Sequence, residues 1–393
     1  MQTNQAKATN GSLFLIVVTF LAFVSLGLPD GLLGVAWPFI SARSKVPIES
    51  LGFLLIAFTT GYLATSSTSG KIITYVSLGM LLTLSCTLTG ISLLTYAVTE
   101  HWFVILVASF FLGSGGGAID SSINTFAASN FHASTVNWLH AFYGIGATTG
   151  PLLVTLMLST DLEWYHAYLT VATVQLSLAV LFLFTRHRWK VTSKDEEHHS
   201  SSEYFDTLRL PIVWLYMIIF FLYTGLEQGF GQWLFTILTK SRNVEDEYAG
   251  MAASFYWGSL TVGRIIFGIL LTKIPVGKVL AGAILGIVLG LATFAFDVNA
   301  LTNLAGITIL GIANAPVFPS LIAITPERIG KEHTGTAIGV QISMAMLGGA
   351  LVPGIAGFLS DDYGLEVISV IFAICSILLA AAYFASLSKS KLQ

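Results

Sequence analysis

Apolar residues are arranged along this chain in long uninterrupted runs. A helix needs about 20 such residues to cross the hydrocarbon core of a bilayer. Twelve runs meet that length, at approximately 13–39, 50–70, 72–98, 102–127, 138–158, 163–185, 211–237, 247–272, 276–296, 300–322, 335–359 and 364–387. They lack the alternation of apolar and polar residues that marks the strands of a membrane barrel. The pattern predicts an all-α membrane protein with twelve transmembrane helices.

One dense polar segment, 186–210, separates the first six runs from the last six. His198 and His199 lie within it, but two adjacent histidines on a loop form a poor metal-binding pair, so a solvated linker is the simpler interpretation. The predicted domains are an N-terminal six-helix bundle at 1–185, a cytoplasmic linker at 186–210 and a C-terminal six-helix bundle at 211–393.

The two halves of the chain resemble each other. A shift of 197 residues pairs Asp30 with Glu227, and a shift of 202 pairs Pro151 with Pro353. Small insertions in loops account for the drift between the two shifts. A parallel repeat of six helices is typical of one large class of secondary transporters, which bind substrate near the bilayer midplane between the halves.

Composition narrows the functional classes. Hydrophobic residues make up 54% of the chain and charged residues 10%, with a formal net charge of −3. These values exclude a soluble enzyme, a disordered protein and a nucleic-acid-binding protein. Cys86 and Cys375 lie in apolar runs and indicate neither a disulfide framework nor a metal site. No catalytic triad, phosphate-binding loop or metal-ligand spacing is recognisable, so we expect no enzymatic activity and no cofactor.

Lys and Arg indicate the orientation. Most of them fall on one side of the membrane when both chain ends are placed there, which predicts cytoplasmic termini. No cleavable signal peptide is indicated, because the first apolar run is too long for one. Short loops favour the inner (plasma) membrane of a bacterium.

Four charged residues lie inside predicted spans: Asp30, Asp120, Glu227 and Arg264. A charge at the bilayer centre costs about 2.5–3.5 kcal/mol on insertion scales, so each needs a reason. Burial favours the neutral form of a carboxyl, which lets it bind and release a proton during a transport cycle. The three acids are therefore candidate proton-coupling residues, with structural hydrogen bonding as the alternative. Arg264, near one end of its span, is a candidate gating residue or a structural one.

Neutral polar and aromatic residues form the candidate substrate site. Asn124 shares a helical face with Asp120, and Asn137 and His140 share another. Amides bind sugar hydroxyls, and aromatic rings stack on the apolar faces of sugars. The candidates are Asn124, Asn137, His140, Tyr143, Gln175, Gln228, Gln232, Trp233, Trp257, Asn314 and Gln341. Interhelical hydrogen bonding or packing is the alternative for each.

Four stretches carry a family resemblance: Asn137–Pro151, Tyr223–Trp233, Trp257–Arg264 and Phe318–Leu321. Together they resemble the fucose–galactose–glucose:proton symporter branch of the major facilitator superfamily, including its sodium-coupled glucose relatives. The resemblance covers nearly the whole chain. It implies two pseudo-symmetric six-helix bundles and secondary active transport by alternating access.

The resemblance also implies roles for individual residues. Sugar–proton members use an acid on the first helix and another on the fourth, and Asp30 and Asp120 occupy those positions. An asparagine on the fifth helix contributes to their sugar site, and Asn137 is its match. Sodium-coupled relatives would use similar carboxylates to hold a cation, so the coupling ion is H⁺ or Na⁺.

Two segments depart from the family pattern: 69–79 lacks the acid and the Arg cluster of the superfamily signature, and the first-span segment Gly27–Gly34 is unlike that of the sugar symporters. Gly146–Pro151 resembles the core of an antiporter motif and supports the efflux alternative. We expect proton-coupled symport of a monosaccharide, a hexose or deoxyhexose, by a chain for which a monomer suffices. The alternatives are a sodium-coupled sugar symporter, a proton-coupled drug or metabolite efflux antiporter, and a sensor without turnover. The expected partners are the sugar and the lipid bilayer, with no nucleic acid and no bound metal.

Overall fold

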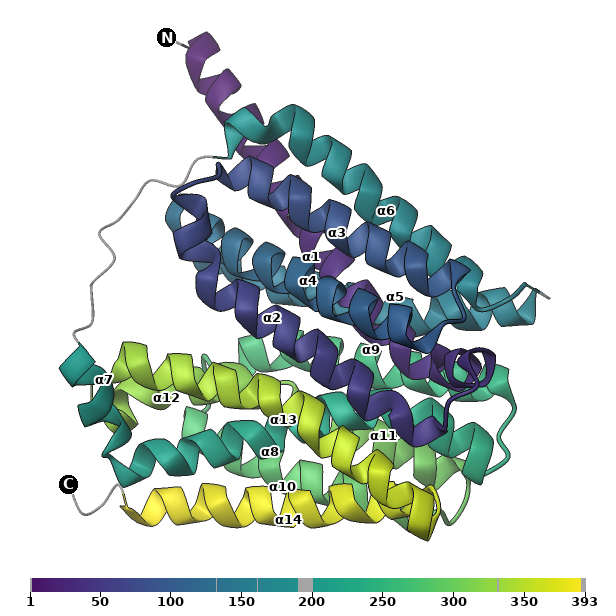
Figure 1. Ribbon diagram of the computed structural model, residues 1–393. Helices are drawn as coiled ribbons and strands as arrows, with labels where there is room; N and C mark the ends of the chain where they lie inside the picture. The colour runs from purple at the N-terminus through teal and green to yellow at the C-terminus, as the bar shows by residue number, and fades with distance from the viewer. Residues whose placement is uncertain (1, 132, 161, 190–200, 331, 390–393) are drawn as a thin grey trace. The chain divides into compact units, whose positions relative to one another are not determined.

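The computed structural model describes residues 2–131, 133–160, 162–189, 201–330 and 332–389. Side chains are described in these ranges except at 2–12, 133, 134, 136, 137, 201–204, 388 and 389. The described residues form helices and no strand (Figure 1). The α-helices are α1 (Gln2–Ser44), α2 (Leu51–Ile73), α3 (Leu78–Val98), α4 (Trp102–Asn130), α5 (Ala133–Ser159), α6 (Tyr165–Thr185), α7 (Ser201–Leu208), α8 (Pro211–Thr236), α9 (Asp246–Leu270), α10 (Val276–Ala295), α11 (Ala300–Asn314), α12 (Val317–Ile329), α13 (Thr334–Tyr363) and α14 (Glu366–Lys389).

Within the described residues, twelve helical segments are long and apolar enough to span a membrane. The predicted fold class is confirmed, and the chain is a multi-pass membrane protein. Two boundaries differ from the sequence pattern. The third span begins at Leu78 and not at 72, because the backbone turns after Ile73 although apolar residues continue there. The tenth span is two helices, α11 and α12, because Pro316 has no N–H to continue the hydrogen-bond ladder.

Packing divides the chain into two units. Unit 1 comprises Met1–Leu33 and Thr60–Thr192, and unit 2 comprises Gly34–Thr59 and Ser193–Gln393. The division therefore runs through α1 and α2. Gly34 in unit 2 lies so close to α8 that an added Cβ would be 2.5 Å from the carbonyl oxygen of Gly231. The domain boundaries that the sequence predicts remain a prediction.

Helix pairing within each unit follows the internal repeat. In unit 1, α3 packs on α4 and α6. In unit 2, α10 packs on α11 and α14, which are the corresponding spans of the second half. Figure 1 shows α8, α10 and α14 side by side. The same pairs of spans are thus in contact in both halves, as a duplicated bundle requires.

Both described ends of the predicted linker pack on helices. Trp189 is buried, and its ring centroid lies 4.9 Å from that of Phe126 and 5.0 Å from that of Phe182. At the other end, the Thr207 hydroxyl of α7 lies 2.9 Å from His333 Nδ1. His198 and His199 lie outside the described residues. The linker role that the sequence predicts for 186–210 remains a prediction.

Candidate proton and substrate site

Two acids of unit 1 each bind a tyrosine. The Tyr143 hydroxyl donates to Asp30 Oδ2, and the Tyr62 hydroxyl donates to Asp120 Oδ2 at 2.5 Å. Asn124 Nδ2 donates to Asp120 Oδ1 at 2.9 Å, as their spacing on one helical face predicts. The two carboxyls also act electrostatically on each other. We call Asp30, Tyr62, Asp120, Asn124 and Tyr143 the acid cluster.

Close helix packing brings the acid cluster together. Gly27 lies against the backbone of Tyr143, and an added Cβ there would be 2.7 Å from the amide nitrogen of Ala147. Gly117 likewise lies against the backbone of Tyr62. Small residues let helix backbones approach in a membrane, where side-chain burial gives no hydrophobic gain. The glycines therefore hold α5 beside α1 and α2 beside α4 with the tyrosines facing the acids.

The stretch that resembles an antiporter motif has a packing role. Gly150 meets α1, where an added Cβ would be 2.6 Å from the carbonyl oxygen of Leu28. Gly146 lies against the carbonyl of Val24. Pro151 follows inside α5 and packs against Gly31. Close packing of α1 and α5 accounts for these three residues without an efflux function.

The start of α5 carries two further candidates. His140 is exposed, lies within electrostatic reach of Asp120, and packs edge-on against Phe23 with ring centroids 5.9 Å apart. Nearby, Phe142 stacks on Phe20 with centroids 4.3 Å apart. The side chain of Asn137 lies outside the described part of the structure. His140 thus borders the acid cluster, and the role of Asn137 remains a prediction.

A second polar cluster surrounds the buried acid of unit 2. The Tyr223 hydroxyl lies within hydrogen-bond reach of Glu227 Oε2 and, at 2.9 Å, of the backbone oxygen of Asn314. Arg264 Nη2 lies 3.5 Å from Glu227 Oε1. The Tyr256 hydroxyl donates to the backbone oxygen of Glu227 at 2.8 Å and accepts from Asn314 Nδ2 at 3.1 Å. We call these five residues the glutamate cluster.

The glutamate cluster lies beside the break between α11 and α12. Gly311 lets α11 approach α9, because an added Cβ would be 2.7 Å from the carbonyl oxygen of Tyr256. Asn314 is the last residue of α11 and is fully buried, and its Oδ1 has no hydrogen-bond partner among the described residues. Discontinuous helices often mark the binding region of transporters, because their freed backbone groups line a cavity.

Several predicted substrate residues make contacts between helices instead. Gln175 donates to a carbonyl of α1 at 3.0 Å, Gln341 accepts from a threonine of α12 at 3.1 Å, and Trp233 donates to a carbonyl of α13 at 3.0 Å. All three are fully buried. These contacts are the interhelical alternative that the sequence left open. Their part in substrate binding remains a prediction.

The remaining candidates lie on α8 and α9. Trp257 is buried against Gly231, and Gln232 is also buried. Gln228 is half-buried, and its side chain faces Gly349 of α13. None of these contacts identifies a ligand group.

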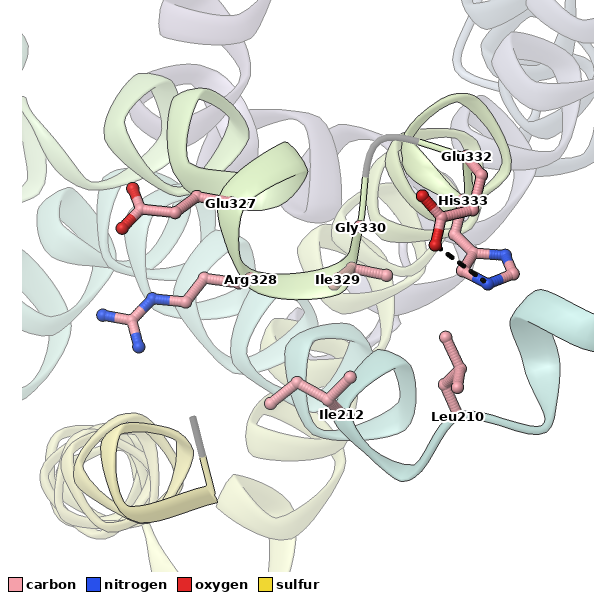
Figure 2. A pocket seen from close by; sticks show the side chains of 8 residues that line it. All are labelled: Leu210, Ile212, Glu327, Arg328, Ile329, Gly330, Glu332 and His333. Carbon is pink, nitrogen blue, oxygen red and sulfur yellow. Dashed lines mark ion pairs between the residues drawn. The ribbon is translucent and has the colours of Figure 1, made fainter. Parts of the chain in front are cut away.

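One surface pocket lies apart from both clusters. Figure 2 shows it between the start of α8 and the junction of α12 with α13. Its lining residues are Leu210, Ile212, Glu327, Arg328, Ile329, Gly330, Glu332 and His333. No predicted site residue lines it, and it carries acidic and basic side chains together. The pocket therefore does not bear on the predicted proton or substrate site.

Three tyrosines of the clusters were not among the site residues predicted from the sequence. Tyr223 is four residues before Glu227, so its position on the same helical face was a usable signal. Tyr256 adjoins the candidate Trp257 but was not selected. Tyr62 is 58 residues from Asp120, and no local pattern connects them.

Comparison with known proteins gives one family. The family model described as Major Facilitator Superfamily matches residues 15–353 and, in a second alignment, 237–392. The glucose/mannose transporter GlcP of Bacillus subtilis is 23% identical over 86% of this chain and 85% of its own length. The human sodium-dependent glucose transporter 1 is 22% identical over 87% of this chain and 73% of its own length.

Among solved structures, the nucleoside transporter NupG (D323A mutant) superposes with a TM-score of 0.81. The two sequences are 16% identical, and the superposition covers 99% of the NupG chain and 95% of this chain. At this level of identity the likeness shows the fold alone.

Proposed function

Because the chain belongs to the Major Facilitator Superfamily, we propose that it is a proton-coupled symporter of a monosaccharide, a hexose or deoxyhexose. It is a secondary transporter and not an enzyme, in agreement with the sequence analysis. The names of the sugar-transporting relatives support the substrate class. The amide and aromatic side chains predicted from the sequence suit hydroxylated substrates.

The acid cluster is the observation that carries the proton coupling. A carboxyl in a low-dielectric site is costly as an anion and much less so when protonated. Asp30 and Asp120 lie close enough to repel each other when both are ionised. A proton on either one relieves that repulsion, and the tyrosine hydroxyls stabilise whichever carboxyl remains ionised. The pair is therefore suited to take up and release a proton in each cycle.

The topology belongs to the same proposal. The termini are cytoplasmic, the membrane is a bacterial inner membrane, and two bundles joined by the linker rock about the substrate. One chain contains both bundles, so a monomer suffices. Arg264 contributes to gating through its ion pair with Glu227.

A pH-sensitive dye in proteoliposomes tests the proposed function. Hexoses, deoxyhexoses and amino sugars are added one at a time, with and without sodium. We expect one sugar to alkalinise the outer medium in the absence of sodium, and Asp30→Asn and Asp120→Asn to abolish that response. Intact proton uptake in both variants would refute the assignment.

The same assay distinguishes the alternatives. Sugar uptake that requires sodium and moves no protons would identify a sodium symporter. Proton movement on adding cationic dyes, with no response to any sugar, would identify an efflux antiporter. Silence to both would refute the proposed substrate class.

A further inference from the structure

Both carboxyl oxygens of Asp120 face hydrogen-bond donors on neutral side chains. The Tyr62 hydroxyl donates to Oδ2 at 2.5 Å, and Asn124 Nδ2 donates to Oδ1 at 2.9 Å. Tyr62 belongs to α2, whereas Asn124 lies four residues after Asp120 on α4. A hydroxyl both donates and accepts, but an amide nitrogen only donates. Asp120 Oδ1 is therefore held as an acceptor, while Oδ2 can exchange roles with the Tyr62 hydroxyl.

A proton fits this arrangement without any movement of heavy atoms. When Oδ2 of Asp120 binds a proton, the new O–H donates to the Tyr62 oxygen, and the Tyr62 hydrogen turns about its C–O bond. Oδ1 becomes the carbonyl oxygen of the neutral acid and still accepts from Asn124. The amide thus satisfies Oδ1 equally in the neutral and the ionised acid.

A sodium ion does not fit the same arrangement. Hard metal cations take oxygen lone pairs as ligands. The Asn124 amide presents hydrogens to Oδ1, and their partial positive charge repels a cation there. To bind sodium beside Oδ1, the Asn124 side chain would have to turn over and give up its hydrogen bond to Asp120. That loss opposes sodium binding and leaves proton binding unaffected.

The other members of the acid cluster do not discriminate between the two ions. The Tyr143 hydroxyl binds Asp30, so the cluster holds two carboxyls and two hydroxyls whose oxygens can bind a metal cation. His140 is the other titratable group that acts electrostatically on Asp120. Of the atoms joined by the three hydrogen bonds of the cluster, only Asn124 Nδ2 has no lone pair for a cation.

We propose that Asn124 is a positioning residue that makes the acid cluster select H⁺ over Na⁺. Its amide keeps a donor on Asp120 in both charge states and so denies the carboxylate to a metal cation. The inference rests on the proposed function for the part that Asp120 plays in coupling. It adds the residue that determines which ion the cluster accepts, a choice that the carboxyls alone leave open.

Thermal unfolding of the full chain in detergent micelles tests the proposal. Melting temperatures are compared at pH 8 in sodium chloride and in choline chloride of equal ionic strength. Asn124→Asp replaces the donor by carboxylate oxygens one helical turn from Asp120, where two like charges repel each other and a cation relieves the repulsion. We expect sodium to raise the melting temperature of this variant by at least about 2 °C. The unaltered protein should melt at the same temperature in both salts.

Asn130→Asp is the matched control on the same helix. Asn130 is exposed, and its Nδ2 donates to the backbone oxygen of Phe126 at 2.9 Å, so the variant makes the same chemical change away from the acid cluster. It should show no response to sodium. Equal responses of Asn124→Asp and Asn130→Asp would overturn the proposal, because a merely structural role of Asn124 changes stability alike in both salts.

The unaltered protein provides a second, independent test. A higher melting temperature in sodium than in choline would overturn the proposal even if Asn124→Asp did not fold. These measurements use no sugar, so the selectivity of the cluster can fail while proton–sugar symport holds. Absence of a response to any sugar would instead refute the proposed function and leave the comparison of the two salts intact.

Discussion

A single arginine connects three loop regions of unit 2, and its removal has a calculable effect. Arg242 is 3% exposed, and its Nε and Nη2 each donate to Glu366 at 2.9 Å. Its Nη1 lies 3.2 Å from Asp297, and the guanidinium lies 4.2 Å from the ring centroid of Phe294. The side chain thus ties the segment after α8 to the end of α10 and the start of α14. We predict that Arg242→Ala destabilises unit 2.

The exposure of the partners sets the magnitude. A buried ion pair broken on one side loses about 3–5 kcal/mol. Glu366 and Asp297 are 45% and 43% exposed, so water replaces part of what they lose. We assign about 1.5 kcal/mol to the forked pair with Glu366 and about 1 kcal/mol to the contact with Phe294. The expected loss for Arg242→Ala is about 2.5 kcal/mol. Arg242→Lys keeps the positive charge but cannot make both hydrogen bonds to Glu366, so its free energy of unfolding should fall by about half as much.

Reversible unfolding in mixed detergent micelles measures these free energies. Lys240→Ala, at an exposed position in the same turn, is the matched control and should change stability by less than about 0.5 kcal/mol. A double-mutant cycle of Arg242→Ala with Glu366→Gln should give a coupling energy of about 1 kcal/mol. Equal stability of Arg242→Ala and Lys240→Ala, or zero coupling, would refute the reasoning.

Three further predictions concern a tyrosine of the acid cluster, the packing of α1 on α5 and two buried glutamines. Tyr62→Phe removes a hydrogen bond to a carboxyl, worth about 1.5–3 kcal/mol, and should lower the rate of proton-driven uptake at least about tenfold; an unchanged rate would count against the cluster. Gly27→Ala places a Cβ against the backbone of α5 and should destabilise the protein by about 1–3 kcal/mol in thermal unfolding. The added Cβ of Gly282→Ala meets open space, so this control variant should unfold like the unaltered protein. Equal melting temperatures for the two variants would contradict the close packing of α1 on α5. Gln175→Leu and Gln341→Leu should each lose about 1 kcal/mol of stability with unchanged substrate KM, and a tenfold rise in KM would show instead that the residue binds substrate.

Hydrophobic patterning predicted most of the fold because a membrane span needs a minimum length of apolar residues. It failed where backbone chemistry ended a helix inside an apolar run. The break at Pro316 divides the tenth span, and the turn after Ile73 delays the third. The residues at both helix ends are apolar enough to lie in a membrane, so the hydrophobic pattern alone did not reveal either end.

The candidate site was predictable only where its signal was local. Asp30, Asp120 and Glu227 attract notice because charges are rare in membrane spans, and Asn124 follows from helical spacing. The pairing of Tyr62 with Asp120 joins different helices, and only the packed structure brings them together. Buried glutamines show the reverse difficulty, because an amide that binds substrate and one that joins two helices look alike in a sequence.

The central claim is that Asp30 and Asp120 couple proton movement to substrate movement. The most direct test compares two transport modes in the same proteoliposomes with Asp30→Asn and Asp120→Asn. Exchange of labelled for unlabelled sugar at equal concentrations needs no net proton movement, whereas accumulation driven by an imposed pH gradient does. We expect both variants to retain exchange and to lose gradient-driven accumulation. Accumulation that persists in both variants would contradict the account.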